Sequence, residues 1–203
     1  SLLTHKGKML TYFRVYVHSD RLLIEDVGEI GETTFQALRK FLLYGTKAKM
    51  DQAADLSLLL VSGPRTERLI TGALGTQAGL VGQLAPLSYV MIEVDGHQMW
   101  VIRTEETGEL DIEILVPVAI VPTLWARLWQ VGASLGAKPF GAEAREILRG
   151  EAGLPRAGVD LTEEIVPPEA NLEGKAFSLS KGCYPGQEVV ARMDTYGSVR
   201  RRM

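Results

Sequence analysis

The stretch 87-LSYVMIEVDGHQMWVIR-103 contains two runs rich in β-branched and aromatic residues, joined by Asp95 and Gly96. An Asp-Gly pair between two such runs is a strong signal for a β-hairpin, because it suits the positive φ angles of a two-residue turn. The stretch therefore predicts two antiparallel strands. A further strand is expected over residues 110–116, after a Thr-Gly turn.

The N-terminal part of the chain has a similar pattern of strand-like runs joined by a turn. Residues 9–17 and 21–25 are rich in β-branched, aromatic and aliphatic residues, and the turn-like residues 18–20 between them predict a second hairpin. Apolar residues then recur at helical spacing at Phe35, Leu38, Leu42 and Leu43. They predict an amphipathic helix that begins after Gly31 and ends at Gly45.

Further elements follow on both sides of the central hairpin. The apolar run of residues 56–61 predicts a strand, and Pro64 predicts the start of a helix that runs through residue 74. An apolar periodic stretch over residues 124–131 predicts a buried helix, and residues 142–148 predict a shorter one. Residues 150–171, rich in Pro and Gly, are expected to form an ordered but irregular connector.

This order of elements determines the expected fold class. Antiparallel hairpins mixed with packed helices favour an α+β protein over a doubly wound parallel sheet. Two ferredoxin-like lobes would accommodate the pattern, with a first lobe over residues 1–80, a second over 81–150, and a connecting segment over 151–203. The sequence contains neither Gly-x-Gly-x-x-Gly after a strand nor a Walker-type Gly-Lys-Ser/Thr, so it gives no positive signal for dinucleotide or NTP binding.

Composition narrows the class of protein. The 203 residues are 46% hydrophobic and 23% charged, which is ordinary for a globular chain. A single cysteine excludes an internal disulfide and a cysteine-rich zinc site, so a reducing, cytoplasmic compartment is expected. No apolar run approaches the roughly 20 residues that span a bilayer, and no N-terminal signal pattern is visible. We therefore expect a soluble protein with no membrane partner.

Charge is distributed unevenly along the chain. Residues 171–203 carry a local charge of +3, which leaves −6 on residues 1–170 within the net charge of −3. Two interpretations stay open: the arginines at 200–202 form a solvated tail, or the basic end holds an anion-binding site near Cys183. The overall acidity argues against a general nucleic-acid binder.

The segment 181-KGCYPGQE-188 contains the chain's one cysteine, Cys183, between glycines and before a helix-like stretch. Glycines allow close approach of a ligand to the backbone, and a following helix start favours a thiolate, so an exposed, functional thiol is predicted. Glu188 and Arg192 are spaced i, i+4 on the expected helix. They form either a weak surface ion pair, or a pair in which Arg192 faces an anionic ligand.

Other residues offer weaker signals. The three histidines, at positions 5, 18 and 97, show no metal-binding spacing, so no metal site is predicted, and none lies in a recognisable Cys-His catalytic motif. The three tryptophans are assigned to core packing, which is the usual place for large aromatic side chains; they are Trp100, Trp125 and Trp129.

The segment 181–188 with Arg192 resembles the signature of the YgfZ-type folate-binding proteins, relatives of the glycine-cleavage T-protein that act in iron–sulfur cluster maintenance and tRNA modification. Similarity to that family also occurs, in the same order, in residues 6–9, 153–155 and 168–172. The resemblance thus extends across nearly the whole chain. It implies ferredoxin-like lobes of the T-protein folate-binding fold.

The resemblance implies a tetrahydrofolate-type cofactor, or a one-carbon derivative of it, bound beside Cys183 as the catalytic or sensing thiol. Tyr184 and Gln187 would serve the flat pterin ring, and Lys181 or Arg192 would serve the carboxylates of the glutamate tail. Glu188 belongs to the same implied ligand-binding set. Iron–sulfur enzymes or their assembly factors are the implied protein partners.

Two departures from the family pattern matter. Members begin with several tens of residues before the strand at residues 6–9 and end with a small β-barrel, and this sequence shows neither, so a partial protein is expected. T-protein relatives carry a pair of Asp residues in that first strand, where this chain has Met9, Leu10, Thr11 and Tyr12. A folate-dependent aminomethyltransferase is therefore the alternative function, and a purely structural partner-binding module is a third.

Overall fold

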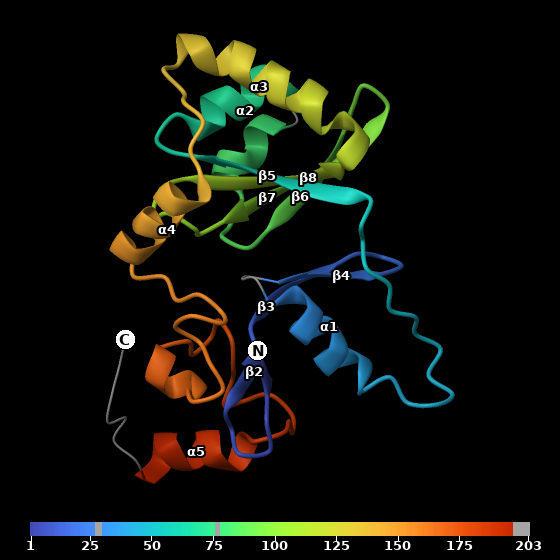
Figure 1. The fold of residues 1–203 in the computed structure, drawn as a ribbon, viewed down its shortest axis with the longest axis vertical. Helices are drawn as coiled ribbons and strands as arrows, with labels where there is room; N and C mark the ends of the chain where they lie inside the picture. Colours follow the sequence, from blue (N-terminus) through green and yellow to red (C-terminus); the bar gives the residue numbers. More distant parts are fainter. Residues whose placement is uncertain (27–29, 76–77, 197–203) are drawn as a thin grey trace. The chain divides into compact units, whose positions relative to one another are not determined.

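The computed structural model describes residues 1–26, 30–75 and 78–196. They fall into two compact units (Figure 1). The first unit comprises Ser1–Met50 and the segment from Pro155 onward, and the second unit comprises Asp51–Leu154. The lobe boundaries at residues 80 and 150 stay a prediction; by packing, the chain passes between the units after Met50 and after Leu154.

The second unit is built on a four-stranded antiparallel sheet in the order β5-β8-β7-β6. Its strands are β5 (Leu56–Ser62), β6 (Tyr89–Val94), β7 (His97–Thr104) and β8 (Asp111–Pro117). Strands β6 and β7 form the predicted hairpin, and Asp95 and Gly96 have φ angles of 54° and 79°, as a tight two-residue turn requires. The central prediction from the sequence is confirmed.

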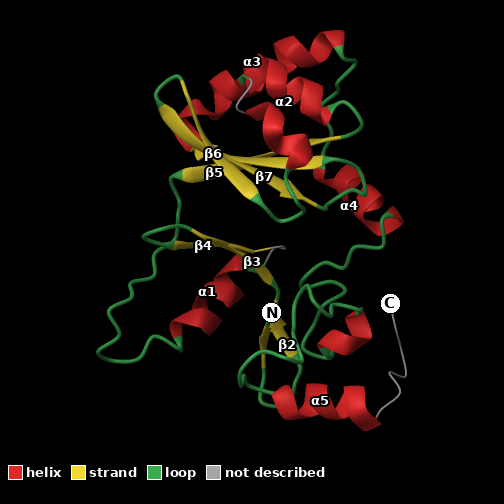
Figure 2. Cartoon of the chain, turned by 180° about the vertical axis from the view of Figure 1, so that it is seen from behind, coloured by secondary structure: helices red, strands yellow, loops and turns green. Residues whose placement is uncertain are grey.

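Helices α2 (Thr66–Leu74) and α3 (Val121–Ser134) cover one face of this sheet, and the 3-10 helix η1 (Ala78–Gln83) completes the layer (Figure 2). Alternate residues of β8 point into the core between the layers, and Ile112 and Ile114 are fully buried there. Each fully buried aliphatic side chain contributes about 1.5–3 kcal/mol relative to exposure. A further helix, α4 (Ala142–Glu151), follows along the chain.

The first unit is less regular. Its elements are two short hairpins and three helical segments, namely β1 (Leu2–Leu3) with β2 (Met9–Thr11), β3 (Phe13–Val17) with β4 (Leu22–Asp26), α1 (Gly31–Arg39), η3 (Pro167–Ala170) and α5 (Gln187–Tyr196). The predicted second hairpin is present as β3 and β4, but its first strand begins at Phe13 and not at Met9, because residues 9–11 form β2 and pair with β1. Together the two units make a mixed α+β fold, which confirms the predicted class.

The core of the first unit joins the beginning of the chain to its end. Leu3 and Met9 from the first hairpin pack with Val190 of α5 and with side chains of the irregular connector, among them Leu161 and Leu172. The predicted irregular connector over residues 150–171 is confirmed from residue 152 onward, where it has one short 3-10 helix, while residues 150 and 151 still belong to α4. Because its apolar side chains are buried, it contributes to the core as well as linking elements.

Helix α1 is shorter than the sequence predicts. It ends at Arg39, and residues 41–44, two of which were assigned to its apolar face, lie in turns with exposed side chains. The Phe41 amide donates to the Leu38 carbonyl oxygen and the Leu42 amide to that of Arg39, which replaces the helical pattern by tighter turns. Helical spacing therefore extended past the real end of the helix.

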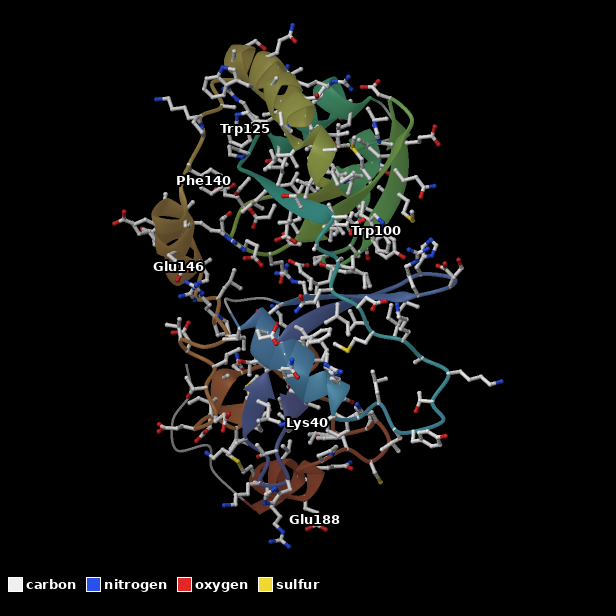
Figure 3. All side chains as sticks on the ribbon, turned by 45° about the vertical axis from the view of Figure 1, so that its right-hand side comes forward. Lys40, Trp100, Trp125, Phe140, Glu146 and Glu188 are labelled. Atoms are coloured by element: carbon white, nitrogen blue, oxygen red, sulfur yellow. The ribbon has the colours of Figure 1, made fainter. Side chains whose placement is uncertain are left out.

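The core assignment of the tryptophans is wrong for two of the three. Trp125 and Trp129 are 49% and 50% exposed, and Figure 3 shows Trp125 on α3. The buried stripe of α3 runs through Leu124 and Leu128, and each tryptophan follows one of these by a single residue, which turns it about 100° around the helix. Trp100 is half-buried and stacks on Tyr89, with ring centroids 4.7 Å apart.

In the part of the chain that the structure describes, no helix has the length and apolar character needed to cross a bilayer.

Candidate functional site

The segment 178–186, which we call the Cys183 loop, is folded back on itself by two contacts. The Tyr184 hydroxyl donates a hydrogen bond to the Ser178 carbonyl oxygen over 3.3 Å. The Lys181 Nζ lies 5.2 Å from the centre of the Tyr184 ring, which is a cation–π arrangement. Cys183 lies between these residues and is exposed, so the predicted exposure of the thiol is confirmed.

Tyr184 is the partly buried residue that joins this loop to the core of the first unit. Its ring packs against the core of the first unit, and burial raises the pKa of its phenol above the ordinary value. The phenol is therefore neutral at physiological pH and acts as a hydrogen-bond donor to Ser178. Lys181 reaches the same ring, so the loop presents a cation and an aromatic ring beside the thiol.

The loop ends in a close contact between two backbones. Gly186 has a φ of 79°, and a Cβ atom placed on it would lie 2.6 Å from the Cα of Gly7, which is closer than real Cβ atoms approach. Gly7 stands in the turn between β1 and β2. The Lys-Gly-Lys segment at residues 6–8 and the segment 181–188, both part of the family resemblance, thus meet in the structure.

Helix α5 carries the remaining predicted site residues. The Gln187 amide donates to the Tyr184 carbonyl oxygen over 3.2 Å, which joins the helix to the loop. Val190 is fully buried and anchors the helix to the core. Glu188 and Arg192 are 3.9 Å apart with side chains 90% and 77% exposed, and Figure 3 shows Glu188 at the outer side of α5. Of the two interpretations, the structure contains the weak surface ion pair.

The structure therefore brings the predicted residues together in two groups. Lys181, Cys183 and Tyr184 share the loop, while Glu188 and Arg192 share the exposed side of the first turns of α5. No group of His, Cys, Asp or Glu among the described residues has an arrangement that could hold a metal ion.

Strand β2, where the resemblance described above implies a pair of Asp residues, carries no carboxylate. Thr11 is buried on β2, and its hydroxyl is hydrogen bonded to that of Thr34 in α1. The Thr34 hydroxyl in turn donates to Asp26 Oδ2 over 2.5 Å, and the Ile30 amide donates to Asp26 Oδ1 over 3.3 Å. The carboxylate in this network thus comes from the end of β4, where it also holds the start of α1.

Two fully buried acids in the second unit are not among the residues predicted from the sequence. Asp111 is fully buried and accepts hydrogen bonds from the amides of Glu106 and Thr107 and from the Thr107 hydroxyl, at 2.6–2.7 Å. It therefore organises the turn between β7 and β8. Glu113, two residues further along β8, is also fully buried. The alternation of both acids with Ile112 and Ile114 in a predicted strand places them on the opposite face of β8 from the isoleucines, but it does not predict that this face is buried.

Comparison with known proteins agrees with this fold. The family described as "GCVT N-terminal domain" matches residues 2–179. The chain therefore belongs to the GCVT N-terminal domain family, which is the T-protein-like superfamily.

Curated relatives of this chain include proteins named "Aminomethyltransferase". A protein named "Aminomethyltransferase" from Caldanaerobacter subterraneus subsp. tengcongensis is 29% identical over 97% of this chain and 52% of its own length. Another of that name, from Symbiobacterium thermophilum, is 36% identical over 75% of this chain and 40% of its own length. The chain thus spans about half the length of the curated relatives it matches.

A solved structure resembles the fold over the same share of the chain. The "glycine cleavage system aminomethyltransferase T" from Bartonella henselae matches with a TM-score of 0.78 at 22% identity, covering 97% of this chain and 52% of that one. At this identity the match describes the fold. It is consistent with the mixed α+β arrangement and adds no statement about individual residues.

Proposed function

We propose that the chain is the folate-binding portion of a T-protein-like protein, with tetrahydrofolate or a one-carbon derivative as its ligand. The observation that carries this proposal is the family match over residues 2–179. Relatives named aminomethyltransferase support transfer of an aminomethyl carbon to tetrahydrofolate as the first candidate activity.

Within this proposal the Cys183 loop contributes to ligand binding. Tyr184 offers an aromatic ring next to the Lys181 ammonium, a combination that suits a flat heterocycle with an anionic tail. Gln187 is half-buried at the start of α5 and can exchange hydrogen bonds with ring heteroatoms. Glu188 and Arg192 lie in solvent, so Arg192 can leave its weak ion pair for a ligand carboxylate at little cost.

Two observations favour a second candidate, a folate-binding accessory protein of the YgfZ type that supports iron–sulfur cluster assembly or repair, and thereby tRNA modification. The thiol of Cys183 is exposed within the segment that resembles the YgfZ signature. In addition, Thr11 and Tyr12 stand where T-proteins carry their Asp pair, and Thr11 is buried in a hydrogen-bonded network. A cytoplasmic location and iron–sulfur enzymes as partners belong to this candidate.

Titration with tetrahydrofolate tests the part that both candidates share. A ligand that binds the folded state alone raises its stability by about 2.7 kcal/mol at a hundredfold excess over Kd, so a clear rise in Tm is expected. The Lys181→Gln variant should bind more weakly, whereas Lys47→Gln, at an exposed position in the first unit, should bind like the unaltered protein. Absence of any thermal shift would instead favour a structural, partner-binding module.

Salt dependence separates a shaped pocket from a simple cluster of charge. Binding through exposed cations such as Arg192 weakens steeply as ionic strength rises, because the Debye length falls to about 3 Å at 1 M salt. Binding that also stacks a pterin ring should retain much of its affinity.

The two activities are separated by different assays. Tetrahydrofolate-dependent transfer of the aminomethyl carbon from a donor protein, with formation of methylene-tetrahydrofolate and release of the nitrogen as ammonia, would favour the transferase. For the accessory role, Cys183→Ala should fail to restore iron–sulfur enzyme activities in cells that lack the native copy, while Ser180→Ala, at an exposed position of the same loop, should restore them. Full restoration by Cys183→Ala would remove the main support for that role.

A further inference from the structure

The turn of the β1–β2 hairpin and the end of the Cys183 loop touch through backbone atoms. A Cβ atom on Gly186 would overlap the Thr4 carbonyl oxygen and lie 2.7 Å from the Gly7 nitrogen. A Cβ atom on Gly7 would lie 2.9 Å from Val189 Cβ and 3.3 Å from the Gly186 carbonyl oxygen. Neither position has room for a side chain unless the loop and the hairpin move apart.

The hairpin side of this contact is held firmly. The Thr4 amide donates to the Lys8 carbonyl oxygen over 2.8 Å, and the Lys8 amide donates to the Thr4 hydroxyl over 3.1 Å. Below the turn, Met9 is buried and its amide donates to the Ile165 carbonyl oxygen over 3.0 Å. The turn is therefore a fixed surface against which Gly186 rests.

On the loop side, Leu179 and Tyr184 are partly buried against the core of the first unit, whereas the residues between them, which include the thiol, are exposed. Lys181, Gly182 and Cys183 are exposed, and the long hydrogen bond from Tyr184 to Ser178 joins two residues of the loop itself. The contact at Gly186 ties the loop to the hairpin instead. It also fixes the start of α5, because the Val189 and Val190 amides both donate to the Gly186 carbonyl oxygen.

We propose that Gly7 is a positioning residue for Cys183: its lack of a side chain lets the hairpin turn hold Gly186, and through it the loop that carries the thiol. Lys6 and Lys8 flank Gly7, so the same contact places the Lys-Gly-Lys segment next to the loop. The inference rests on the proposed function for its consequence in ligand binding, but the positioning itself can be measured without any ligand.

The test uses a nitroxide spin label attached to Cys183, which needs no engineered site because the chain has one cysteine. In Gly7→Ala the mobile fraction of the label's spectrum should rise about twofold, because the loop loses its support. Gly174→Ala is the matched control: Gly174 has the same φ of 74°, but a Cβ atom there would meet open space within 4 Å. It carries the same backbone strain, so its spectrum should equal that of the unaltered protein.

The same comparison can be made from the other side of the contact. Gly186→Ala should mobilise the label, whereas Gly96→Ala, at an equal φ of 79° with open space around it, should not. If Gly7→Ala and Gly186→Ala fail to fold, Val189→Ala keeps the inference testable, since it shortens a side chain under Gly7 without backbone strain. It should give a smaller rise in mobility.

Hydrogen exchange distinguishes positioning from general destabilisation. In Gly7→Ala, amides of residues 178–190 should exchange about tenfold faster, while amides of residues 166–172 in the same core keep their rates. Equal acceleration of both segments, or equal label spectra for Gly7→Ala and Gly174→Ala, would overturn the inference.

Measurement of tetrahydrofolate binding then distinguishes a failure of this inference from a failure of the proposed function. If both hold, Gly7→Ala weakens tetrahydrofolate binding about tenfold and Gly174→Ala does not. If the unaltered protein does not bind tetrahydrofolate, the proposed function fails, while the label spectra and exchange rates still decide whether Gly7 positions Cys183.

Discussion

The two units of this chain achieve stability in different ways. The second unit has one continuous core, in which 14 of the described residues, all buried and apolar, pack together from the sheet and its covering helices. The first unit has a core of seven buried residues among those described, supplied by short hairpins, an irregular connector and α5. Since buried apolar area provides most of the driving force for folding, the second unit should have the larger free energy of unfolding.

The difference shows where function can reside. A small core leaves more of the chain in turns and loops, which can present a thiol, a cation and an aromatic ring together, as the Cys183 loop does. Such a unit depends on close backbone contacts, such as that of Gly7 with Gly186, where a large core would otherwise hold the chain. Substitutions in each unit test this difference.

Truncation of the second core should be the most costly change. Ile114→Ala removes a fully buried side chain between the sheet and α2/α3, and should lower the free energy of unfolding by about 3–4 kcal/mol. Ile147→Ala is the matched control, because Ile147 on α4 is 58% exposed, and it should cost less than about 1 kcal/mol. Urea unfolding measures both, and equal losses would contradict the description of this core.

The second-largest loss of stability is expected for a change in the buried turn between β7 and β8. Asp111→Asn replaces one carboxylate oxygen by an NH2 group, which cannot accept a hydrogen bond. At least one of the three hydrogen bonds donated by Glu106 and Thr107 is then lost, which should lower the free energy of unfolding by about 1–3 kcal/mol. The same change at the exposed Asp55 should be close to neutral. Thermal unfolding of both variants provides the measurement, and a neutral Asp111→Asn would mean that the turn does not depend on this carboxylate.

In the first unit, substitution of Tyr184 should lower the free energy of unfolding by less, and by an amount that depends on pH. Burial raises the pKa of Tyr184 above its ordinary value of 10.0, so the folded state holds the phenolic proton more tightly than the unfolded chain does. The stabilisation that comes from this difference in pKa is fully present below pH 10, and it is lost as the pH rises through the raised pKa of the folded state.

Tyr184→Phe removes both this pH dependence and the hydrogen bond to Ser178, at a cost of about 0.5–1 kcal/mol near neutral pH. Urea unfolding at about pH 8 and about pH 11 should show that the unaltered protein loses more stability than the variant between these conditions. A larger loss in the variant would contradict the burial of this phenol.

The smallest effect is expected for the pair on α5. Glu188 and Arg192 are mostly exposed and 3.9 Å apart, so a double-mutant cycle to alanine should give a coupling of about 0.3 kcal/mol, which salt reduces. Stability should therefore hardly change in Arg192→Ala. A fall in tetrahydrofolate affinity in that variant would assign the arginine to the ligand, whereas a coupling above about 1 kcal/mol would show that the pair is structural.

Several elements followed directly from local sequence. The hairpin of β6 and β7 was predictable because Asp95 and Gly96 suit its turn, and α3 because Leu124 and Leu128 repeat at helical spacing. Predictions failed where a large apolar residue was expected to be buried and is exposed instead. The spacing of Leu42 and Leu43 extends past the end of α1, and Trp125 is large and apolar but falls outside the buried stripe of its helix.

The candidate site was predictable to a similar extent. The exposure of Cys183 and its neighbourhood with Lys181 and Tyr184 follow from a short segment of glycines and turn residues, whose preferences act between near neighbours. The pairing of Glu188 with Arg192 also follows from spacing along one helix.

By itself the sequence thus determined the α+β class, most strands and helices, and the segment in which an exposed thiol is presented. The tertiary structure decided that Gly7 meets Gly186, and that Asp26 reaches Thr11 through Thr34. The physical reason is that propensity and periodicity act over a few residues. Contacts between distant segments depend instead on the path of the whole chain, which is fixed when the core of each unit packs.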